Sequence, residues 1–371
     1  MTDDDERAAQ AFRAAFATRA DDFAPEPLSG EPVRRPRRAW PAVLLAAAAV
    51  LVLTVGTLVW QQTRGTDHRA SAPAVSGLPD GWRWESHADV EVAVPDSWGY
   101  RATPGSDWCA AYDQQGKPQD GGAAFPHTPY VDTVSGLGAT LGIGCFAPKP
   151  SSLLATHLTF VDSPDLRAEP PGALSGFTTI TRAVGSTHVD VTTDSAHEDL
   201  ARQILATAHV VSADQNGCPA SSPIQASHAV RPDPTFDVTA LTGVDSIAVC
   251  QYLTHGTGQP GLLASRLLTG SAADAELTAL QAAPAGGGPD QPQSCTPDGW
   301  GDTAVVLRLT TDGRTHDMYG YYEWCFGNGF DDGTSVRELT SADCSSLWAD
   351  RVQLLGGSSA PFHRCQPSVR Y

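Results

Sequence analysis

The apolar run from Trp40 to Trp60 constrains the fold of this chain more than any other segment. No residue between the two tryptophans carries a charge, and a helix of this length covers about 30 Å, the thickness of the hydrocarbon core of a bilayer. The stretch Val43–Leu53 is apolar on every face, whereas a helix in the core of a soluble protein is normally amphipathic. The run therefore predicts one transmembrane helix in contact with the lipid bilayer.

A cleaved secretory signal is the alternative interpretation of this run. Signal peptides usually carry an apolar region of about 7–15 residues near the N-terminus, whereas this run follows a 39-residue leader. The nearest small-x-small pattern, Ala70-Ser71-Ala72, lies well beyond the end of the run. We therefore expect an anchor that stays uncleaved.

The charges on either side of the run predict its orientation. Arginines crowd its N-terminal side, and fewer follow it: Arg34, Arg35, Arg37 and Arg38 precede it, and Arg64 and Arg69 come after. Because cytoplasmic flanks of membrane helices carry the excess of basic residues, we expect a single-pass cell-membrane protein with a cytoplasmic N-terminus and an extracytoplasmic C-terminal region.

The cysteines agree with this topology. All eight follow the apolar run: Cys109, Cys145, Cys218, Cys250, Cys295, Cys325, Cys344 and Cys365. An even number on one side is typical of an oxidising compartment, and the chain contains no C-x-x-C pair of the kind that binds zinc. We expect four disulfide bonds. Eight cysteines allow 105 pairings, so the spacing leaves the connectivity open; we guess successive pairs, with two falling in each expected module or end.

The net charge argues against one class of partner. The chain carries −18, and 7 basic and 8 acidic residues precede Trp40, which leaves 17 basic and 34 acidic residues, or about −17, for the remainder. A surface this acidic repels phosphate backbones, so we expect no nucleic-acid binding by the outer region. The two lysines among many arginines and alanines indicate a high-GC actinobacterial genome.

The tail before the apolar run, residues 1–39, predicts a short amphipathic helix and a linker. Acids at its start and arginines behind them complement a helix dipole, and Phe12 and Phe16 fall on one face. Such a helix is either a frayed segment lying on the membrane or a docking helix whose two phenylalanines enter a groove on a partner. Four prolines make residues 25–38 a polar linker.

Residues 61–77 predict a flexible stalk, and residues 78–213 a first α+β module. Period-2 runs indicate a hairpin that begins at Trp82-Arg83-Trp84 and crosses Ser86–Ala88. The expected strands and helix are Asp89–Val94, Ala139–Phe146, His157–Val161, Phe177–Val184, His188–Thr192 and a helix capped by Ser195 with Glu198. We expect these strands to form an antiparallel sheet against which the helix packs.

Residues 214–371 predict a second α+β module in the order β-β-α-β-β-α. The clearest signal is a hairpin in which Thr303–Thr310 and His316–Trp324 flank the turn Thr311–Arg314. The other expected elements are Val244–Tyr252, Leu262–Leu268, a helix with a capping box at Ser271 and Asp274, and a helix capped by Thr340 and Asp343 that runs through Leu354. Fold class is thus α+β, in two disulfide-bonded extracytoplasmic modules behind one transmembrane helix.

Segments of the sequence resemble two groups of known proteins. The segments V-E-V-A-V-P-D-S-W-G-Y and D-L-A-R-Q-I-L-A-T-A-H-V-V resemble the PsbP/Mog1-like family over residues 78–212; that family contains non-enzymatic binding and assembly proteins. The tail A-F-R-A-A-F-A-T-R-A-D-D-F-A-P, with G-W-R-W-E-S, V-C-Q-Y and N-G-F-D-D-G, is similar to uncharacterised single-pass envelope proteins of actinobacteria. Some of these have the layout of membrane anti-sigma factors. This tail departs from the zinc-type anti-sigma pattern because it has no cysteine or histidine.

Motifs that carry enzyme chemistry are missing. The sequence has no G-x-S-x-G, S-x-x-K or H-E-x-x-H, so we expect no enzyme, no cofactor and no metal centre. Asp331 and Asp332 lie in a glycine-rich loop without the ligand order of a calcium site, which favours a plain turn. Two aromatic clusters are interpreted as core rather than as sugar-stacking surface: Trp82, Trp84, Trp98 and Trp108, and Tyr319, Tyr321, Tyr322 and Trp324.

Two functions remain open from the sequence. The first is a non-enzymatic extracytoplasmic binding or sensing protein that signals to a cytoplasmic partner, such as a sigma factor, through the Phe12 and Phe16 helix. The second is a structural envelope protein that binds cell-wall glycans. No motif identifies a ligand for either.

Overall fold

The computed structural model describes residues 78–105, 107–133, 145, 149–162, 176–226, 230–254, 261–291, 301–355 and 359–366. The predicted tail helix with Phe12 and Phe16, the anchor at Trp40–Trp60 and nearly all of the strand predicted at Ala139–Phe146 lie outside these ranges. Within them, no helix combines the length and the apolar character needed to cross a bilayer.

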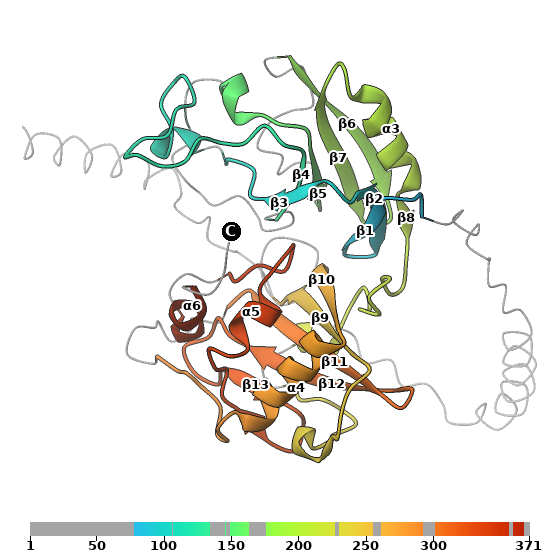
Figure 1. Cartoon of the computed structure of the whole chain (residues 1–371), viewed down its shortest axis with the longest axis vertical. Coiled ribbons are helices and arrows are strands. Elements are labelled where there is room, and N and C mark those ends of the chain that lie inside the picture. The colour runs from blue at the N-terminus through green and yellow to red at the C-terminus, as the bar shows by residue number, and fades with distance from the viewer. Residues whose placement is uncertain are drawn as a thin grey trace, which may run out of the picture. The chain divides into compact units, whose positions relative to one another are not determined.

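Residues 74–371 form one compact unit of the α+β class. Its described part contains three sheets (Figure 1), two before residue 214 and one after it. We call residues 78–213 the first module and residues 214–371 the second module, and each has its own buried clusters. The predicted α+β class is confirmed.

A three-stranded sheet opens the first module. β1 (Trp82–His87) and β2 (Val90–Pro95) form the predicted antiparallel hairpin, and β8 (His209–Val210) pairs with the outer edge of β2. The turn is tighter than predicted, because β1 continues through His87 and the chain reverses at Ala88, whose φ is 49°.

The second sheet of the first module mixes parallel and antiparallel pairs. Its order is β3 (Gly99–Arg101), β4 (Tyr130–Asp132), β5 (His157–Val161), β7 (Thr187–Asp194) and β6 (Phe177–Val184). The β6–β7 hairpin lies where the sequence predicts it, but β3, β4 and β5 run parallel, so the purely antiparallel sheet is wrong. Parallel neighbours need long connections instead of hairpin turns, and three-residue strands leave no periodic signal.

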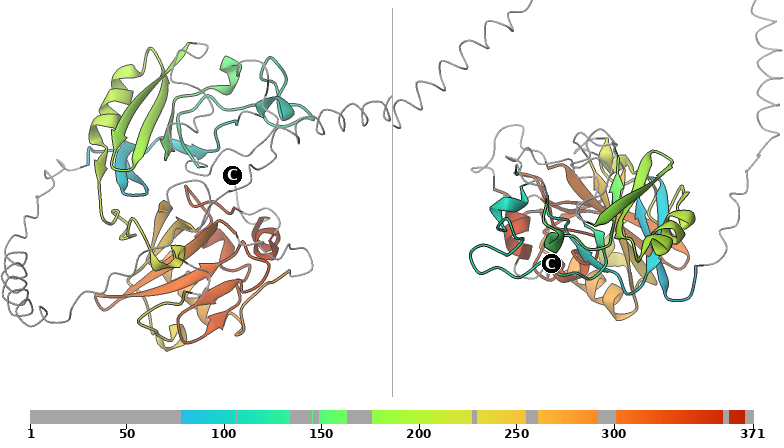
Figure 2. Two further views of the ribbon diagram at one scale, coloured as in Figure 1. Left: turned by 180° about the vertical axis from the view of Figure 1, so that it is seen from behind. Right: turned by 90° about the horizontal axis from the view of Figure 1, so that it is seen from above.

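Helix α3 (Glu198–Thr207) packs against β2 and β7 and closes this core (Figures 1 and 2). Its residues Ala201, Ile204 and Leu205 are buried with the valines of β2 and β7. The predicted Ser195 cap is wrong: His197 occupies the N-cap, and Asp194 accepts hydrogen bonds from the backbone N–H groups of Ala196 and His197.

A loop-rich region of the first module carries two short 3-10 helices, η2 (Trp108–Ala110) and η3 (Ser151–Leu153). A small buried cluster holds it together: Trp108, Phe125, Tyr130, Leu153 and Ala155. Tyr130 of this cluster is the first residue of β4, and Arg101 at the end of β3 lies over the Phe125 ring.

The second module is built on one antiparallel sheet. Its order is β10 (Leu262–Thr269), β9 (Ser246–Leu253), β11 (Thr303–Thr311), β12 (Arg314–Tyr321), β13 (Gly329–Asp331) and β14 (Val336–Arg337). The predicted hairpin is confirmed, with its turn at Asp312 and Gly313, which have φ values of 51° and 71°. β13 and β14 were not predicted.

Both faces of this sheet are buried. Alternate residues of β9 enter different clusters: Ile247 and Val249 pack beneath α4 (Ser271–Ala282), whereas Cys250 and Tyr252 pack against the chain around Cys218 and Ile224. That covering chain includes η5 (Pro223–Gln225), and η6 (Val238–Ala240) follows it.

Two helical predictions in the second module need correction. Ser271 is the first residue of α4, and Gly270, with φ 53°, is its N-cap, so no Ser271–Asp274 capping box forms. The helix expected from Thr340 through Leu354 is only α5 (Cys344–Leu347), although Asp343 does accept hydrogen bonds from Thr340 N–H and Oγ1–H at 2.6 and 2.8 Å. A further helix, α6 (Ala360–Cys365), was not predicted.

Disulfide bonding of the region that follows the apolar run is confirmed. Three bonds join successive cysteines: Cys109–Cys145, Cys218–Cys250 and Cys344–Cys365. Cys325 is also disulfide-bonded, and Cys295 lies outside the described residues. One of these three bonds lies in the first module and two in the second; the guess that two fall in each module or end stays a prediction.

Candidate binding site

The two modules meet through backbone groups of the β1–β2 turn and of β10. Ala88 N–H donates to the carbonyl oxygen of Leu262 at 2.6 Å. At Gly261, a Cβ atom would lie 3.2 Å from both Cα and Cβ of Ala88, so this approach leaves little room for a side chain. The hairpin of the first module therefore touches β10 directly.

Arg351 of the second module is the central polar contact of this junction. Its side chain is 3% exposed, its Nη1 donates to the carbonyl of Ser86, and its Cζ lies 4.4 Å from the centroid of the Phe160 ring. Burial lowers the pKa of Arg351, opposed by Glu85, Asp132, Tyr100 and Asp162, which favour the charged form. The guanidinium is thus a buried cation from one module surrounded by acidic and aromatic groups of the other.

His87 and Asp162 complete this contact. His87 Nε2 lies 2.8 Å from Asp162 Oδ1, and Arg351 Nη2 lies 3.3 Å from His87 Nδ1. These distances fit a tautomer in which Nε2–H donates to Asp162 and Nδ1 accepts from Arg351. Burial opposes ionisation of Asp162, but the hydrogen bonds from His87 and Thr187 and the charge of Arg351 outweigh it and lower the pKa of Asp162.

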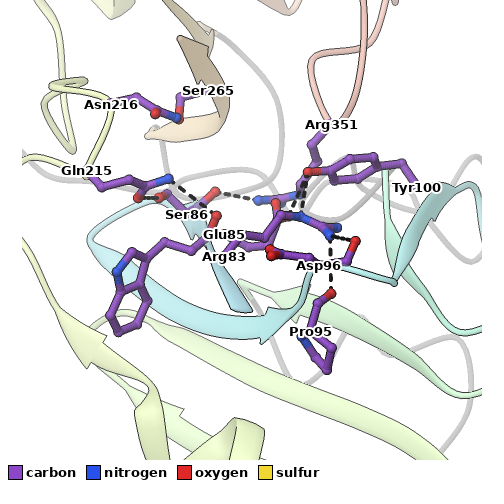
Figure 3. A network of polar contacts seen from close by, with 11 residues as sticks. Arg83, Glu85, Ser86, Pro95, Asp96, Tyr100, Gln215, Asn216, Ser265 and Arg351 are labelled. Atoms are coloured by element: carbon purple, nitrogen blue, oxygen red, sulfur yellow. Dashed lines mark hydrogen bonds and ion pairs between the residues drawn. The ribbon is translucent and has the colours of Figure 1, made fainter. Parts of the chain in front are cut away.

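A second polar triangle lies beside Arg351 in the first module (Figure 3). Arg83 Nε–H donates to Glu85 Oε1 at 2.8 Å and lies 3.0 Å from the hydroxyl oxygen of Tyr100, which donates to the same Glu85 oxygen at 2.8 Å. Burial and the nearby Glu85 carboxylate raise the pKa of Tyr100, so its hydroxyl stays protonated and remains a donor.

The chain that joins the modules enters the same network. Gln215 N–H donates to Glu91 Oε1 at 2.6 Å, and Asn216 Nδ2–H donates to Ser265 Oγ at 2.9 Å. Figure 3 shows Gln215 beside Ser86, with Asn216 and Ser265 next to each other. The connection between the modules is therefore fixed to β2 on one side and to β10 on the other.

A pocket of about 600 Å³ lies between the modules, next to these polar groups. Its lining residues come from both modules: Tyr100, Arg101, Ala102, Thr103, Pro104, Tyr112, Phe125, Thr133, Asp350, Gln353, Leu354 and Leu355. We call it the intermodule pocket. Its volume lies within the range of small-molecule sites.

Two features of the structure shape the walls of the pocket. On the first-module side, β3 delivers Tyr100 and Arg101, and Thr103 Oγ1 lies 3.1 Å from the Tyr130 hydroxyl. On the second-module side, residues 349–355 form a loop, the Arg351 loop, in which Gln353 Nε2–H donates to the carbonyl of Asp350 at 2.7 Å. Gln251 of β9 holds this loop, because its Nε2–H donates to the carbonyl of Gln353 at 2.6 Å.

The described lining of the pocket is chemically mixed. The lining side chains are aromatic, aliphatic, hydroxyl, amide and one each of guanidinium and carboxylate. His157 is buried nearby, stacked on Tyr130 at 5.0 Å between centroids, and burial lowers its pKa to about 4, so it is neutral at ordinary pH. In the part of the chain that the structure describes, no group of three or more His, Cys, Asp or Glu residues is placed to hold a metal ion.

The Asp331 and Asp332 loop has structural partners. Arg231 binds both oxygens of Asp331 at 2.7 Å. Asp332 accepts from the backbone N–H groups of Thr334, Ser335 and Val238 at 2.8, 2.6 and 3.1 Å. These contacts account for both carboxylates as parts of a turn between β13 and β14.

The aromatic clusters singled out in the sequence are mostly core. Six of the eight residues are at most 5% exposed, and Trp82 and Trp84 are half-buried. Trp98 belongs to the core of the first module. In the second module Tyr322 packs against Trp348, with 4.5 Å between the ring centroids. These rings therefore stabilise the fold.

The sequence predicted none of the residues that form the pocket. Among the predicted site residues, seven cysteines are placed and are disulfide-bonded, whereas Phe12, Phe16 and Cys295 lie outside the described residues. Arg101 and Arg351 belong to no motif, and residues 100–133 and 350–355 are too distant in sequence for a local pattern to bring them together.

Comparison of the chain with protein-family models, with curated proteins and with solved structures gave no match.

Proposed function

We propose that this chain is a membrane-anchored extracytoplasmic binding or sensing protein without enzymatic activity. It takes its ligand in the intermodule pocket and signals through its N-terminal helix to a cytoplasmic partner, such as a sigma factor. The observation that carries this proposal is a pocket whose walls come from both modules and that adjoins the buried polar network joining them.

The pocket and the junction share structural parts. Tyr100 lines the pocket and donates to Glu85 within the network. The Arg351 loop lines the pocket with Asp350, Gln353 and Leu354 and inserts Arg351 into the first module. A ligand that shifts this loop would act on the contact between the modules, which is the kind of differential interaction that a sensor requires.

The membrane anchor in this proposal rests on the sequence. The run Trp40–Trp60, the arginines before it and the absence of cysteines from residues 1–108 favour a cytoplasmic tail and an oxidised outer region. The three described disulfides are consistent with that environment.

Filling the pocket should abolish ligand capture. The full chain, reconstituted in lipid nanodiscs, is incubated with a cell-envelope extract, and retained small molecules are identified by mass spectrometry. Ala102→Trp places an indole at an exposed lining position and should lose a compound that the wild type retains. Ala183→Trp, at an exposed position of β6 outside the lining, is the matched control. Equal retention by both variants, or no retained compound at all, would refute the binding function.

The tail should bind a cytoplasmic protein through Phe12 and Phe16. We expect the full chain to retain a partner from a cell lysate and the double variant Phe12→Ala/Phe16→Ala to lose it, because the two rings supply most of the apolar face. Arg13→Ala, between them on the polar side, is the control. A partner retained equally by the double variant would contradict signalling through this helix.

A glycan-binding envelope protein is the second candidate. Two half-buried tyrosines, Tyr100 and Tyr112, line the pocket together with Phe125, and aromatic rings stack on the apolar faces of sugars. Co-sedimentation of the full chain with purified cell wall, lost in Ala102→Trp, would favour this function over small-molecule sensing.

A further inference from the structure

Among the described residues that line the intermodule pocket, Arg101 is the one cation. It is the last residue of β3 and is half-buried, and its Cζ lies 4.7 Å from the centroid of the Phe125 ring, which also lines the pocket. Among the described residues, no hydrogen bond or ion pair engages its guanidinium. Stacking on an aromatic face orients the guanidinium and leaves the N–H groups along its edge free to donate.

The acidic side chains around the pocket have partners of their own. Asp132, beside Arg101 in the β3–β4 register, accepts from Thr103 N–H at 3.1 Å. Asp350, on the opposite wall, lies 3.6 Å from Arg266 Nη2 and is half exposed. The pocket therefore presents a cation whose guanidinium edge has no acceptor among the described residues.

The remaining wall is largely apolar. Leu354 and Phe125 are 3% and 4% exposed, and Leu355 and Pro104 extend the same surface. A ligand that satisfies both parts of the lining has an apolar body and one acceptor group with negative charge. A planar carboxylate matches the two parallel N–H groups of a guanidinium edge.

The charge of the whole chain limits the size of that negative group. With a net charge of −18, the chain repels polyanions at long range, and one arginine can neutralise one charge. A monoanion of small size fits a volume of about 600 Å³, whereas a phosphate-rich polymer does not.

We propose that the intermodule pocket binds a small amphipathic monocarboxylate, with the carboxylate on Arg101 and the apolar body against Phe125 and Leu354. This inference rests on the proposed binding function and specifies the chemical class of its ligand. Thr103, Thr133 and Gln353 line the same pocket and supply hydrogen-bonding groups for any polar substituent.

Matched probe compounds distinguish the contribution of the negative charge to binding from that of the apolar body. Calorimetric titration of the full chain in nanodiscs compares 4-phenylbutanoate, its neutral amide and acetate, with empty nanodiscs as the blank. We expect 4-phenylbutanoate to bind at least about tenfold more tightly than the amide or acetate. Equal binding of the amide and the carboxylate would overturn the assignment of the charge.

Variants identify the cation. Arg101→Met should weaken 4-phenylbutanoate binding by about tenfold or more and leave binding of the amide unchanged. Arg101→Lys should bind 4-phenylbutanoate more tightly than Arg101→Met but less tightly than the wild type, because lysine keeps the positive charge and lacks the paired N–H donors of the guanidinium. Arg314→Met, at an exposed turn position of the second module, is the matched control and should bind as the wild type does.

Failure of this inference is distinguishable from failure of the proposed function. No binding of 4-phenylbutanoate up to about 10 mM, or unchanged binding by Arg101→Met, overturns the carboxylate assignment. The proposed function survives either result if Ala102→Trp still abolishes capture of a compound from the envelope extract.

Discussion

Replacing Arg351 with methionine is expected to lower the free energy of unfolding by about 3 kcal/mol. Removing one member of a buried ionic contact costs about 3–5 kcal/mol because its partners stay buried without it. We expect a loss at the lower end of this range, because Glu85 still pairs with Arg83 and Asp162 still pairs with His87 after the substitution. The carbonyl of Ser86, in contrast, loses the donor that Arg351 supplies.

Urea unfolding of the full chain, followed by tryptophan fluorescence, measures this loss. Arg202→Met is the control, because Arg202 is 59% exposed and pairs with Glu198 and Asp199 on the surface of α3; exposed pairs of this kind contribute about 0–1 kcal/mol. Arg351→Lys should fall between the two, since an ammonium reaches fewer acceptors. A loss no larger than that of Arg202→Met would show that Arg351 does not hold the modules together.

Glu276 on α4 is expected to make the stability fall steeply between about pH 5 and pH 8. Its side chain is 1% exposed; Ser346 Oγ–H donates to Oε2, and Oε1 has no partner among the described residues. Burial, together with the nearby carboxylate of Asp343, raises the pKa of Glu276 to about 8. Burial also raises the pKa of Asp343 itself.

The direction of the pH effect follows from where the proton is held. In the unfolded chain Glu276 ionises near its ordinary value of 4.5, whereas in the folded protein it stays protonated up to about pH 8. Between these values the folded state binds the proton and the unfolded state does not, so the free energy of unfolding falls as pH rises. The rate is about 1.4 kcal/mol per pH unit, and the total loss is about 5 kcal/mol above pH 8.

Glu276→Gln should remove most of this slope. The amide is neutral at every pH, so the variant should match the wild type at pH 4.5 and be more stable by about 5 kcal/mol at pH 9. Urea unfolding midpoints, determined at a series of pH values, measure the pH slope and the difference in stability at pH 9. Asp199→Asn, on the exposed surface of α3, should retain the wild-type slope. Parallel curves for the wild type and Glu276→Gln would mean that Glu276 ionises normally in the folded protein.

The sequence predicted the parts of the fold that local patterns control. The hairpins β6–β7 and β11–β12 alternate apolar and polar residues and turn at Gly185 and Gly313, both with positive φ. Short-range pairing of this kind needs only neighbouring residues, which is why the boundaries agree to within a few positions. The parallel strands β3 and β4 are three residues long and join across distant segments, so no periodicity marks them.

The candidate site could not be predicted from the sequence for a related reason. Arg351 follows an aspartate in a polar turn and looks like a surface arginine, yet the fold buries it against Phe160 of the other module. Arg101 acquires its role only because β3 carries it to the Phe125 ring. Both depend on tertiary placement rather than on neighbours in the chain.

The two-sided burial of β9 has a consequence for the fidelity of oxidative folding. Its residues alternate between the α4 cluster and the cluster around Cys218, and Cys250 belongs to the second. A slip of one residue in the pairing of β9 would turn every side chain to the opposite face and carry Cys250 away from Cys218. Formation of the Cys218–Cys250 bond therefore requires that β9 has already reached its native register, and the bond then holds the strand in that register.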